Sequence, residues 1–224
     1  MSLDDPDFAA RRSAARRRLD AIDDAGDPYR RAWFEAVYEL AGDDPANVPW
    51  ADLTPHPLLA DWLAQAPAPQ SGARALDIGC GLGDNAAAIA AKGWRVTGFD
   101  LSRIAVMWAA KRFPALDFVA ADLFAPPSDW RGAFDLVHEC YTLQALPPGV
   151  RADAMAAMAR FVGPGGRLLV VARVREAATA GPPWPLAAQE IMAFVTYGLS
   201  AETVDQLADL SDGKPHWRAV FRRA

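Results

Sequence analysis

Three glycines at alternate positions mark the stretch LDIGCGLGDN, residues 76–85. Gly79, Gly81 and Gly83 directly follow a short apolar run, and Asp84 follows them. Glycine loses more backbone entropy on folding than any other residue, so three in one turn need a cause. Two causes remain open at this point: a ligand that presses against the backbone, or a tight turn and nothing more.

Carboxylates at the ends of later apolar runs extend this pattern. Asp100 comes about 20 residues after the glycines, where a carboxylate in nucleotide-binding folds takes the ribose hydroxyls. Asp122 ends a third run and could accept a hydrogen bond from an adenine amino group. In the dinucleotide fingerprint a small residue stands three positions after the second glycine, but here Asp84 does. A carboxylate at a helix N-terminus opposes a phosphate, so the pattern favours a nucleoside ligand without phosphates and disfavours a nicotinamide dinucleotide.

A group of polar side chains, HECY, ends a fourth apolar run. Glu139 could contact a cationic part of a ligand or an acceptor, and His138 could act as a base, although a structural role for this histidine stays open. Tyr141 could border a substrate. The two cysteines, Cys80 and Cys140, stand among acidic residues and lack the electropositive surroundings of a reactive thiolate, so we expect them to pack.

Several aromatic residues and a histidine between two prolines are candidates for an acceptor site. If the N-terminal segment covers the sheet edge, Trp33, Trp50 and His56 would form an aromatic, polar-tipped lid, and Trp184 would close it from the other side. The alternative is that Trp33 is a core residue at helical spacing. His216 opens the last predicted strand, and we expect it at the surface.

Strands and helices must alternate to bring these residues together. The apolar runs are ARALDIGC, WRVTGFD, LDFVAAD, FDLVHEC and GRLLVVARV, and helical patterns cover residues 84–92, 102–113 and 150–162, with Ser102 as a cap. Runs that are apolar throughout suit a parallel sheet covered on both faces. The tail, residues 201–223, predicts two strands joined by a turn at 211–215. The order indicates a doubly wound α/β fold.

Composition narrows the class of protein. The chain has 224 residues and a net charge of −5, so its overall field repels nucleic acid and anionic membranes. Residues 1–69 predict a helical segment and lid, and 70–224 the main domain. No run is long and apolar enough to span a bilayer, and no Cys/His cluster has zinc spacing. We expect a cytoplasmic protein without a structural metal, whose partner is a small molecule; the oligomeric state is not readable.

Four runs in order resemble the motifs of class I S-adenosylmethionine-dependent methyltransferases: LDIGCGLG, VTGFDLS, VAADLF and the stretch from FDLVHECY to GGRLLVV. The resemblance covers about residues 74–175. It implies a Rossmann-like, seven-stranded sheet, mostly parallel, whose last two strands form the tail hairpin. It also implies that Asp77 and the glycine loop hold the methionine part of the cofactor, Asp100 the ribose, and Asp122 with Leu123 the adenine.

A narrower resemblance connects VPWADLTPHPLLADWL and GPPWPLAAQEIMAF to the thiopurine, thiol and halide methyltransferase group. The resulting hypothesis is methyl transfer from S-adenosylmethionine to a small, fairly apolar acceptor at S, O or N by in-line displacement. The alternative is a binding protein that has lost catalysis. Predicted cofactor contacts are Asp77, Gly79, Cys80, Gly81, Gly83, Asp84, Asn85, Asp100, Leu101, Ser102, Asp122, Leu123 and Glu139. Catalytic candidates are Glu139, His138 and His56, and substrate contacts are Trp33, Trp50, Tyr141 and Trp184.

Overall fold

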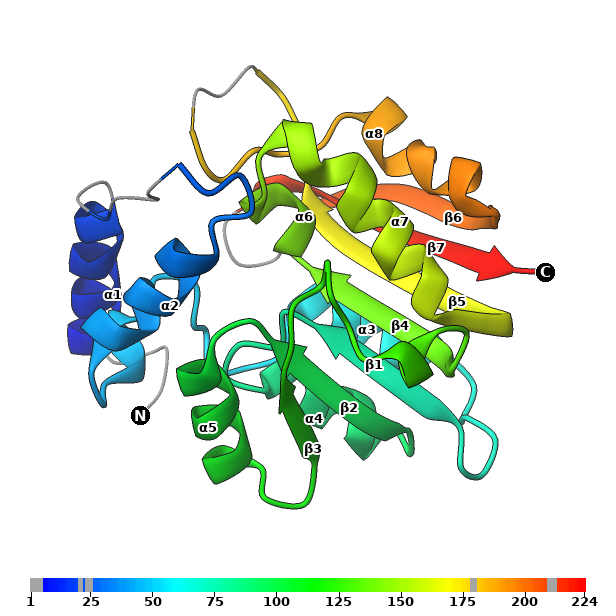
Figure 1. The fold of residues 1–224 in the computed structure, drawn as a ribbon, viewed down its shortest axis with the longest axis horizontal. Helices are drawn as coiled ribbons and strands as arrows, with labels where there is room; N and C mark the ends of the chain where they lie inside the picture. Colours follow the sequence, from blue (N-terminus) through cyan, green and yellow to red (C-terminus); the bar gives the residue numbers. More distant parts are fainter. Residues whose placement is uncertain (1–5, 20–21, 23–25, 178–180, 209–212) are drawn as a thin grey trace.

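A seven-stranded sheet forms the centre of the computed structural model, which describes residues 6–19, 22, 26–177, 181–208 and 213–224. The strand order is β3-β2-β1-β4-β5-β7-β6 (Figure 1). The strands are β1 (Arg74–Ile78), β2 (Arg95–Asp100), β3 (Asp117–Ala120), β4 (Phe134–Cys140), β5 (Val162–Arg173), β6 (Leu199–Ala208) and β7 (Pro215–Arg223). Strands β1 to β5 are parallel, and β7 is antiparallel to both of its neighbours. The predicted mostly parallel sheet with a C-terminal hairpin is confirmed; residues 211 and 212 of the predicted turn lie outside the described part of the chain.

Helices cover both faces of this sheet. The helices are α1 (Pro6–Arg18), α2 (Arg31–Ala41), α3 (Pro57–Gln65), α4 (Asp84–Ala91), α5 (Arg103–Arg112), α6 (Thr142–Ala145), α7 (Arg151–Phe161) and α8 (Ala188–Met192), and the short 3-10 turns are η2 (Pro45–Asn47), η3 (Ser128–Trp130), η4 (Pro148–Val150) and η5 (Ala193–Tyr197). In Figure 1, α7 and α8 lie in front of the sheet, and α3 and α4 lie behind it. The Ser102 hydroxyl caps α5 by accepting a hydrogen bond from the Ala105 N–H at 3.2 Å, as predicted.

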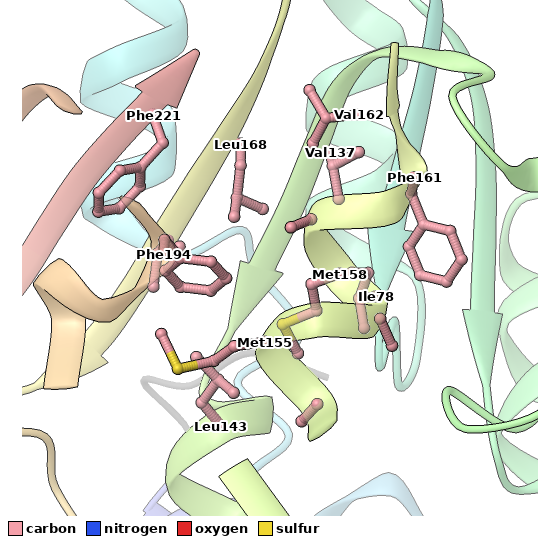
Figure 2. Close-up of a cluster of buried hydrophobic side chains, with 14 of the residues drawn as sticks. Ile78, Val137, Leu143, Met155, Met158, Phe161, Val162, Leu168, Phe194 and Phe221 are labelled. Atoms are coloured by element: carbon pink, nitrogen blue, oxygen red, sulfur yellow. The ribbon is translucent and has the colours of Figure 1, made fainter. Parts of the chain in front are cut away.

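Neighbouring residues of the central strands pack into opposite layers of the core. Leu168 packs into the cluster in front of the sheet, and Leu169, the next residue, into the cluster behind it. Figure 2 shows the front cluster, where Met155 and Met158 of α7 point toward the sheet. Because both faces of the central part of β5 are covered, residues 168–172 are all apolar, which is why the parallel sheet was predictable.

The boundary between α7 and β5 differs from the prediction. The helix ends at Phe161, and β5 begins at Val162, four residues before the predicted run at Gly166. Val162 pairs with Phe134 at the start of β4. This pairing makes residues 162–165 part of β5, although the glycines in this segment do not predict a strand.

The N-terminal helices stand at one edge of the sheet. Figure 1 shows α2 beyond the carboxyl ends of the parallel strands. Tyr38 of α2 packs in a third buried cluster with Leu82 of the glycine loop and Trp108 of α5. Residues from before and after residue 69 therefore share one core.

Candidate active site

The glycine loop joins β1 to α4 at the carboxyl edge of the sheet. Gly79 and Gly83 have positive φ angles of 61° and 88°, which favour glycine. A Cβ atom on Gly79 would lie 2.6 Å from the Thr142 hydroxyl, and one on Gly83 would lie 2.9 Å from the Phe118 ring. The turn and its packing therefore account for these glycines without a ligand. The case for a cofactor site depends on the side chains around the loop.

A buried carboxylate and imidazole stand below the loop. Asp77 of β1 and His138 of β4 lie side by side in the sheet, and Asp77 Oδ1 is 2.7 Å from His138 Nδ1. Both residues are at most 1% exposed. Among the described residues, Asp77 Oδ2 and His138 Nε2 have no hydrogen-bond partner. A buried polar atom without a partner costs free energy, so this pair is suited to a polar ligand group.

Glu139 is the second buried carboxyl group with an unused oxygen. Its Oε2 accepts hydrogen bonds from the N–H groups of Thr142 at 2.9 Å and Leu143 at 3.3 Å, at the start of α6. Its Oε1 is buried and has no partner within the described residues. Burial raises the pKa of Glu139 to about 8, although the two N–H donors act in the opposite direction. A cationic group placed beside Oε1 would stabilise the ionised form.

Asp100 ends β2 and is held in a fixed orientation. Its Oδ2 accepts from the Gly81 N–H at 2.9 Å, and its Oδ1 accepts from the Ser102 N–H at 3.0 Å. Burial raises the pKa of Asp100 to about 6. Each carboxylate oxygen has more than one acceptor direction, so one N–H bond per oxygen leaves the geometry for a diol open.

Two further carboxylates from the sequence prediction are paired with arginines. Asp84 accepts hydrogen bonds from both terminal nitrogens of Arg112, at 2.6 and 2.7 Å. Arg112 therefore balances the charge of Asp84 at the start of α4. Asp122 accepts from Arg31 Nε at 2.8 Å. Leu123, next to it, lines a cavity of about 460 Å³ together with residues of α7.

Aromatic side chains surround a buried arginine at the same edge. The Arg30 guanidinium carbon lies 3.7 Å from the centroid of the Trp33 ring and 5.6 Å from that of Trp184. Arg30 also donates to the carbonyl of Ala145 in α6 at 2.9 Å. Trp33 stacks on Trp50, with ring centroids 6.0 Å apart. The structure thus brings the three predicted tryptophans together, with Trp33 itself buried, and adds Arg30, for which the sequence carried no signal.

Two histidines flank Tyr141 at the carboxyl end of β4. Tyr141 Oη lies 2.8 Å from His56 Nε2 and 2.7 Å from His216 Nε2. His56 also begins α3, where its Nδ1 accepts from the Leu58 N–H, and its own N–H donates to Asn85. The expectation of a surface position for His216 is wrong. The residue is fully buried, because β7 lies between β5 and β6 and is not the edge strand.

The remaining expectations concern thiols, metals and membranes. Burial raises the pKa of the Cys80 thiol, in keeping with a packing role. Within the described ranges, no group of three or more His, Cys, Asp or Glu side chains is placed to hold a metal ion. No helix in that part of the chain is long and apolar enough to cross a membrane.

Comparisons with known proteins agree with this architecture. Residues 44–221 match the family described as thiopurine S-methyltransferase. The chain is 31% identical over 150 residues to a probable thiol methyltransferase 2 of Arabidopsis thaliana, covering 63% of this chain and 64% of that protein. It is 34% identical over 119 residues to a ubiquinone biosynthesis O-methyltransferase of Ralstonia nicotianae, covering 50% of this chain and 48% of that protein. The alignments therefore span about half to two thirds of the length of these relatives.

A solved structure extends the comparison to the fold. A TehB-like S-adenosylmethionine-dependent methyltransferase from Corynebacterium glutamicum superposes with a TM-score of 0.61 at 24% identity, covering 88% of this chain and all of that one. The predicted Rossmann-like fold is confirmed, and the family match over most of the chain confirms the predicted family. The chain belongs to the thiopurine S-methyltransferase family of S-adenosylmethionine-dependent enzymes.

Proposed function

We propose that this protein transfers the methyl group of S-adenosylmethionine to a small, fairly apolar acceptor at sulfur, oxygen or nitrogen, by in-line displacement. One observation carries this proposal: two buried carboxyl groups with unused oxygens, Asp77 and Glu139, lie at the carboxyl edge of the sheet. Trp33, Trp50 and Trp184 lie at the same edge. The cofactor supplies an electrophilic methyl group when bound. The protein has to hold two reactants close together and away from water, which can lower the barrier by several kcal/mol.

The residues at the glycine loop fit the cofactor. In this proposal Asp77 and Glu139 hold the cationic amino-acid part, because each has a buried oxygen without a partner among the described residues. Asp100 accepts the ribose hydroxyls, since two N–H donors already orient its carboxylate. The remaining proposed cofactor contacts are Gly79, Cys80, Gly81, Gly83, Asp84, Asn85, Leu101, Ser102, Asp122 and Leu123. For Asp84 and Asp122, contact with the cofactor would be shared with their arginine partners.

The acceptor is proposed to lie between the glycine loop and the N-terminal segment, residues 1–69, which acts as the lid of the domain 70–224. Trp33, Trp50, Trp184 and Tyr141 supply the apolar surface. Relatives named for S-methylation and for O-methylation both match the chain. The experiment therefore has to identify the nucleophilic atom of the acceptor.

The candidate bases differ in accessibility. His138 is fully buried and bonded to Asp77, so we propose that it orients this carboxylate and takes no proton from an acceptor. His56 is in contact with Tyr141, which is only half-buried. Glu139, with its pKa near 8, is proposed as a ligand of the cationic cofactor.

The test combines binding and turnover. Calorimetry with S-adenosylmethionine, S-adenosylhomocysteine and NAD should give binding of the first two and none of the third. Mass spectrometry with a panel of thiols, phenols and heterocyclic amines should then detect methylated products. Binding without transfer across the panel would favour the catalytically inactive alternative, and absence of binding would refute the proposal.

A further inference from the structure

A chain of hydrogen bonds runs from α3 to β7 through Tyr141. Its central oxygen is Tyr141 Oη, between His56 Nε2 at 2.8 Å and His216 Nε2 at 2.7 Å. At its far ends, His56 Nδ1 is 3.2 Å from the Leu58 nitrogen, and His216 Nδ1 is 2.9 Å from the Lys214 carbonyl oxygen. These two end contacts decide where the protons are.

The end contacts impose opposite tautomers on the two imidazoles. A backbone N–H can only donate, so His56 Nδ1 accepts and the proton of the neutral ring is on Nε2. A carbonyl oxygen can only accept, so His216 Nδ1 carries the proton and its Nε2 accepts. Tyr141 therefore accepts from His56 and donates to His216. Every bond in the chain runs in one direction.

The direction of the chain makes His216 the proton acceptor for Tyr141. Protonation of His56 at Nδ1 would remove the cap of α3 and place a positive charge at a helix N-terminus, which the helix dipole disfavours. His216 has no such restriction, because its Nε2 already accepts from the phenol.

Tyr141 lies at the carboxyl end of β4, at the edge of the sheet where the acceptor is proposed to bind. It follows the strand that carries Glu139, and it is half-buried, whereas His56 and His216 are 8% and 0% exposed. Its φ angle is 68°, a left-handed conformation that is strained for an aromatic residue. Such strain persists where the surrounding structure holds it, and it is concentrated at functional sites. The antiparallel direction of β7 brings the start of that strand, with His216, to the edge where the parallel strands end.

We propose that Tyr141 is the general base of this site, with His216 as its proton acceptor and His56 as a positioning residue. The inference rests on the proposed methyltransferase function. The acceptor's nucleophilic atom keeps the electron pair of its X–H bond and uses it for the new bond to the methyl carbon, while the cofactor sulfur keeps the pair of the bond that breaks. The acceptor proton moves to Tyr141 Oη as the phenol proton moves to His216 Nε2. After product release, the imidazolium returns its proton through Tyr141 to water.

This relay selects a class of substrate. A base contributes only when the acceptor arrives protonated, as an alkyl thiol or an alcohol does at neutral pH. An acceptor that is already ionised gains nothing from Tyr141. The relay therefore favours acceptors that are neutral and protonated, and it does not contribute to the methylation of an anionic nucleophile.

Two thiols of similar size test the proposal, because thiophenol is largely ionised at pH 8 while benzyl mercaptan is largely protonated. For Tyr141→Phe, kcat with benzyl mercaptan should fall on the order of 100-fold, whereas kcat with thiophenol should stay within about 3-fold. His216→Gln, which can accept a hydrogen bond but takes up no proton, should lower kcat with benzyl mercaptan and leave KM unchanged. Tyr197→Phe, on η5 and outside the site, is the matched control. Equal losses for both thiols would overturn the relay.

A second measurement is independent of turnover. Nitrogen-15 chemical shifts of the imidazoles should show His56 protonated at Nε2 and His216 protonated at Nδ1, in the wild-type protein with S-adenosylhomocysteine. The same tautomer at both residues would overturn the proposal even if the variants lose activity. A wild-type protein that shows opposite tautomers but methylates neither these thiols nor the wider panel would refute the proposed function, and not the hydrogen-bond chain.

Discussion

The affinity for the cofactor should depend on pH through Glu139. Burial raises the pKa of this carboxyl group to about 8, so in the free protein it is mostly protonated at neutral pH. A cationic ligand beside Oε1 requires the ionised form, which makes up about 10% of the molecules at pH 7 and about 1% at pH 6. The apparent affinity is reduced by that fraction, about tenfold at pH 7, which corresponds to about 1.4 kcal/mol.

Between pH 6.5 and 7.5 the affinity for S-adenosylhomocysteine should therefore rise about eightfold. Asp100 contributes little in this window, because its pKa of about 6 leaves it mainly ionised throughout. Glu139→Gln should abolish the slope. Glu202→Gln, which changes a carboxylate of β6 paired with Arg167, is the matched control and should keep it.

Isothermal titration calorimetry in two buffers of different ionisation enthalpy measures both the affinity and the number of protons released on binding. At pH 7 the wild-type protein should release about 0.9 proton per ligand bound, and Glu139→Gln close to none. A flat affinity profile for the wild type would mean that Glu139 keeps its protonation state on binding. A slope that survives in Glu139→Gln would place the titrating group elsewhere. Either result would refute the assignment of Glu139 to the cationic part of the cofactor.

Four further changes have defined outcomes. Because the pKa of Glu139 is raised on folding, the free energy of unfolding falls as pH rises from about 4.5 to 8; Glu139→Gln should raise it at pH 8 by about 2–4 kcal/mol in urea titrations. Gly83→Ala should lower the free energy of unfolding by about 1–3 kcal/mol, because φ is 88° and the new Cβ meets an aromatic ring. Arg112→Met should leave Asp84 unpaired beside the glycine loop, lowering the melting temperature and weakening cofactor affinity in calorimetry. Trp184→Ala should raise KM for the acceptor without changing cofactor affinity.

Each of these outcomes has a clear contrary result. Unchanged stability of Glu139→Gln at pH 8 would mean that the buried carboxyl group is not destabilising. A fully stable Gly83→Ala would show that the loop can adopt another backbone conformation. Unaltered cofactor binding in Arg112→Met would mean that the glycine loop does not depend on this ion pair for cofactor affinity. A loss of cofactor affinity in Trp184→Ala would place this tryptophan at the cofactor and not at the acceptor.

The parallel part of the sheet was predictable from the sequence because its strands are covered on both faces. Such strands are mainly apolar away from their carboxyl ends, and β4, residues 134–140, was predicted with its bounds as observed. Ser102 was predictable as a cap for a similar reason, since the cap acts through a bond to a residue three positions away. Both features depend on local chemistry.

The positions of His216, Arg30 and Arg112 were not predictable in this way. His216 was expected at the surface, but β7 pairs with strands on both sides. Arg112 meets Asp84 across 28 residues of chain, and Arg30 meets Ala145 across 115. Pairings of this kind depend on which elements become neighbours, which residue type and spacing do not determine.

The sequence alone determined the order of strands and helices, the carboxylates at the strand ends and the family to which these motifs belong, because apolar periodicity and turn residues act over a few positions. Only the tertiary structure decided which polar atoms stay unused and which pair: that Arg112 neutralises Asp84, that Glu139 keeps a buried oxygen, and that Tyr141 lies between two histidines. Hydrogen bonds and burial depend on distances between segments that are far apart along the chain. Those distances are established when the strands pair and the helices pack.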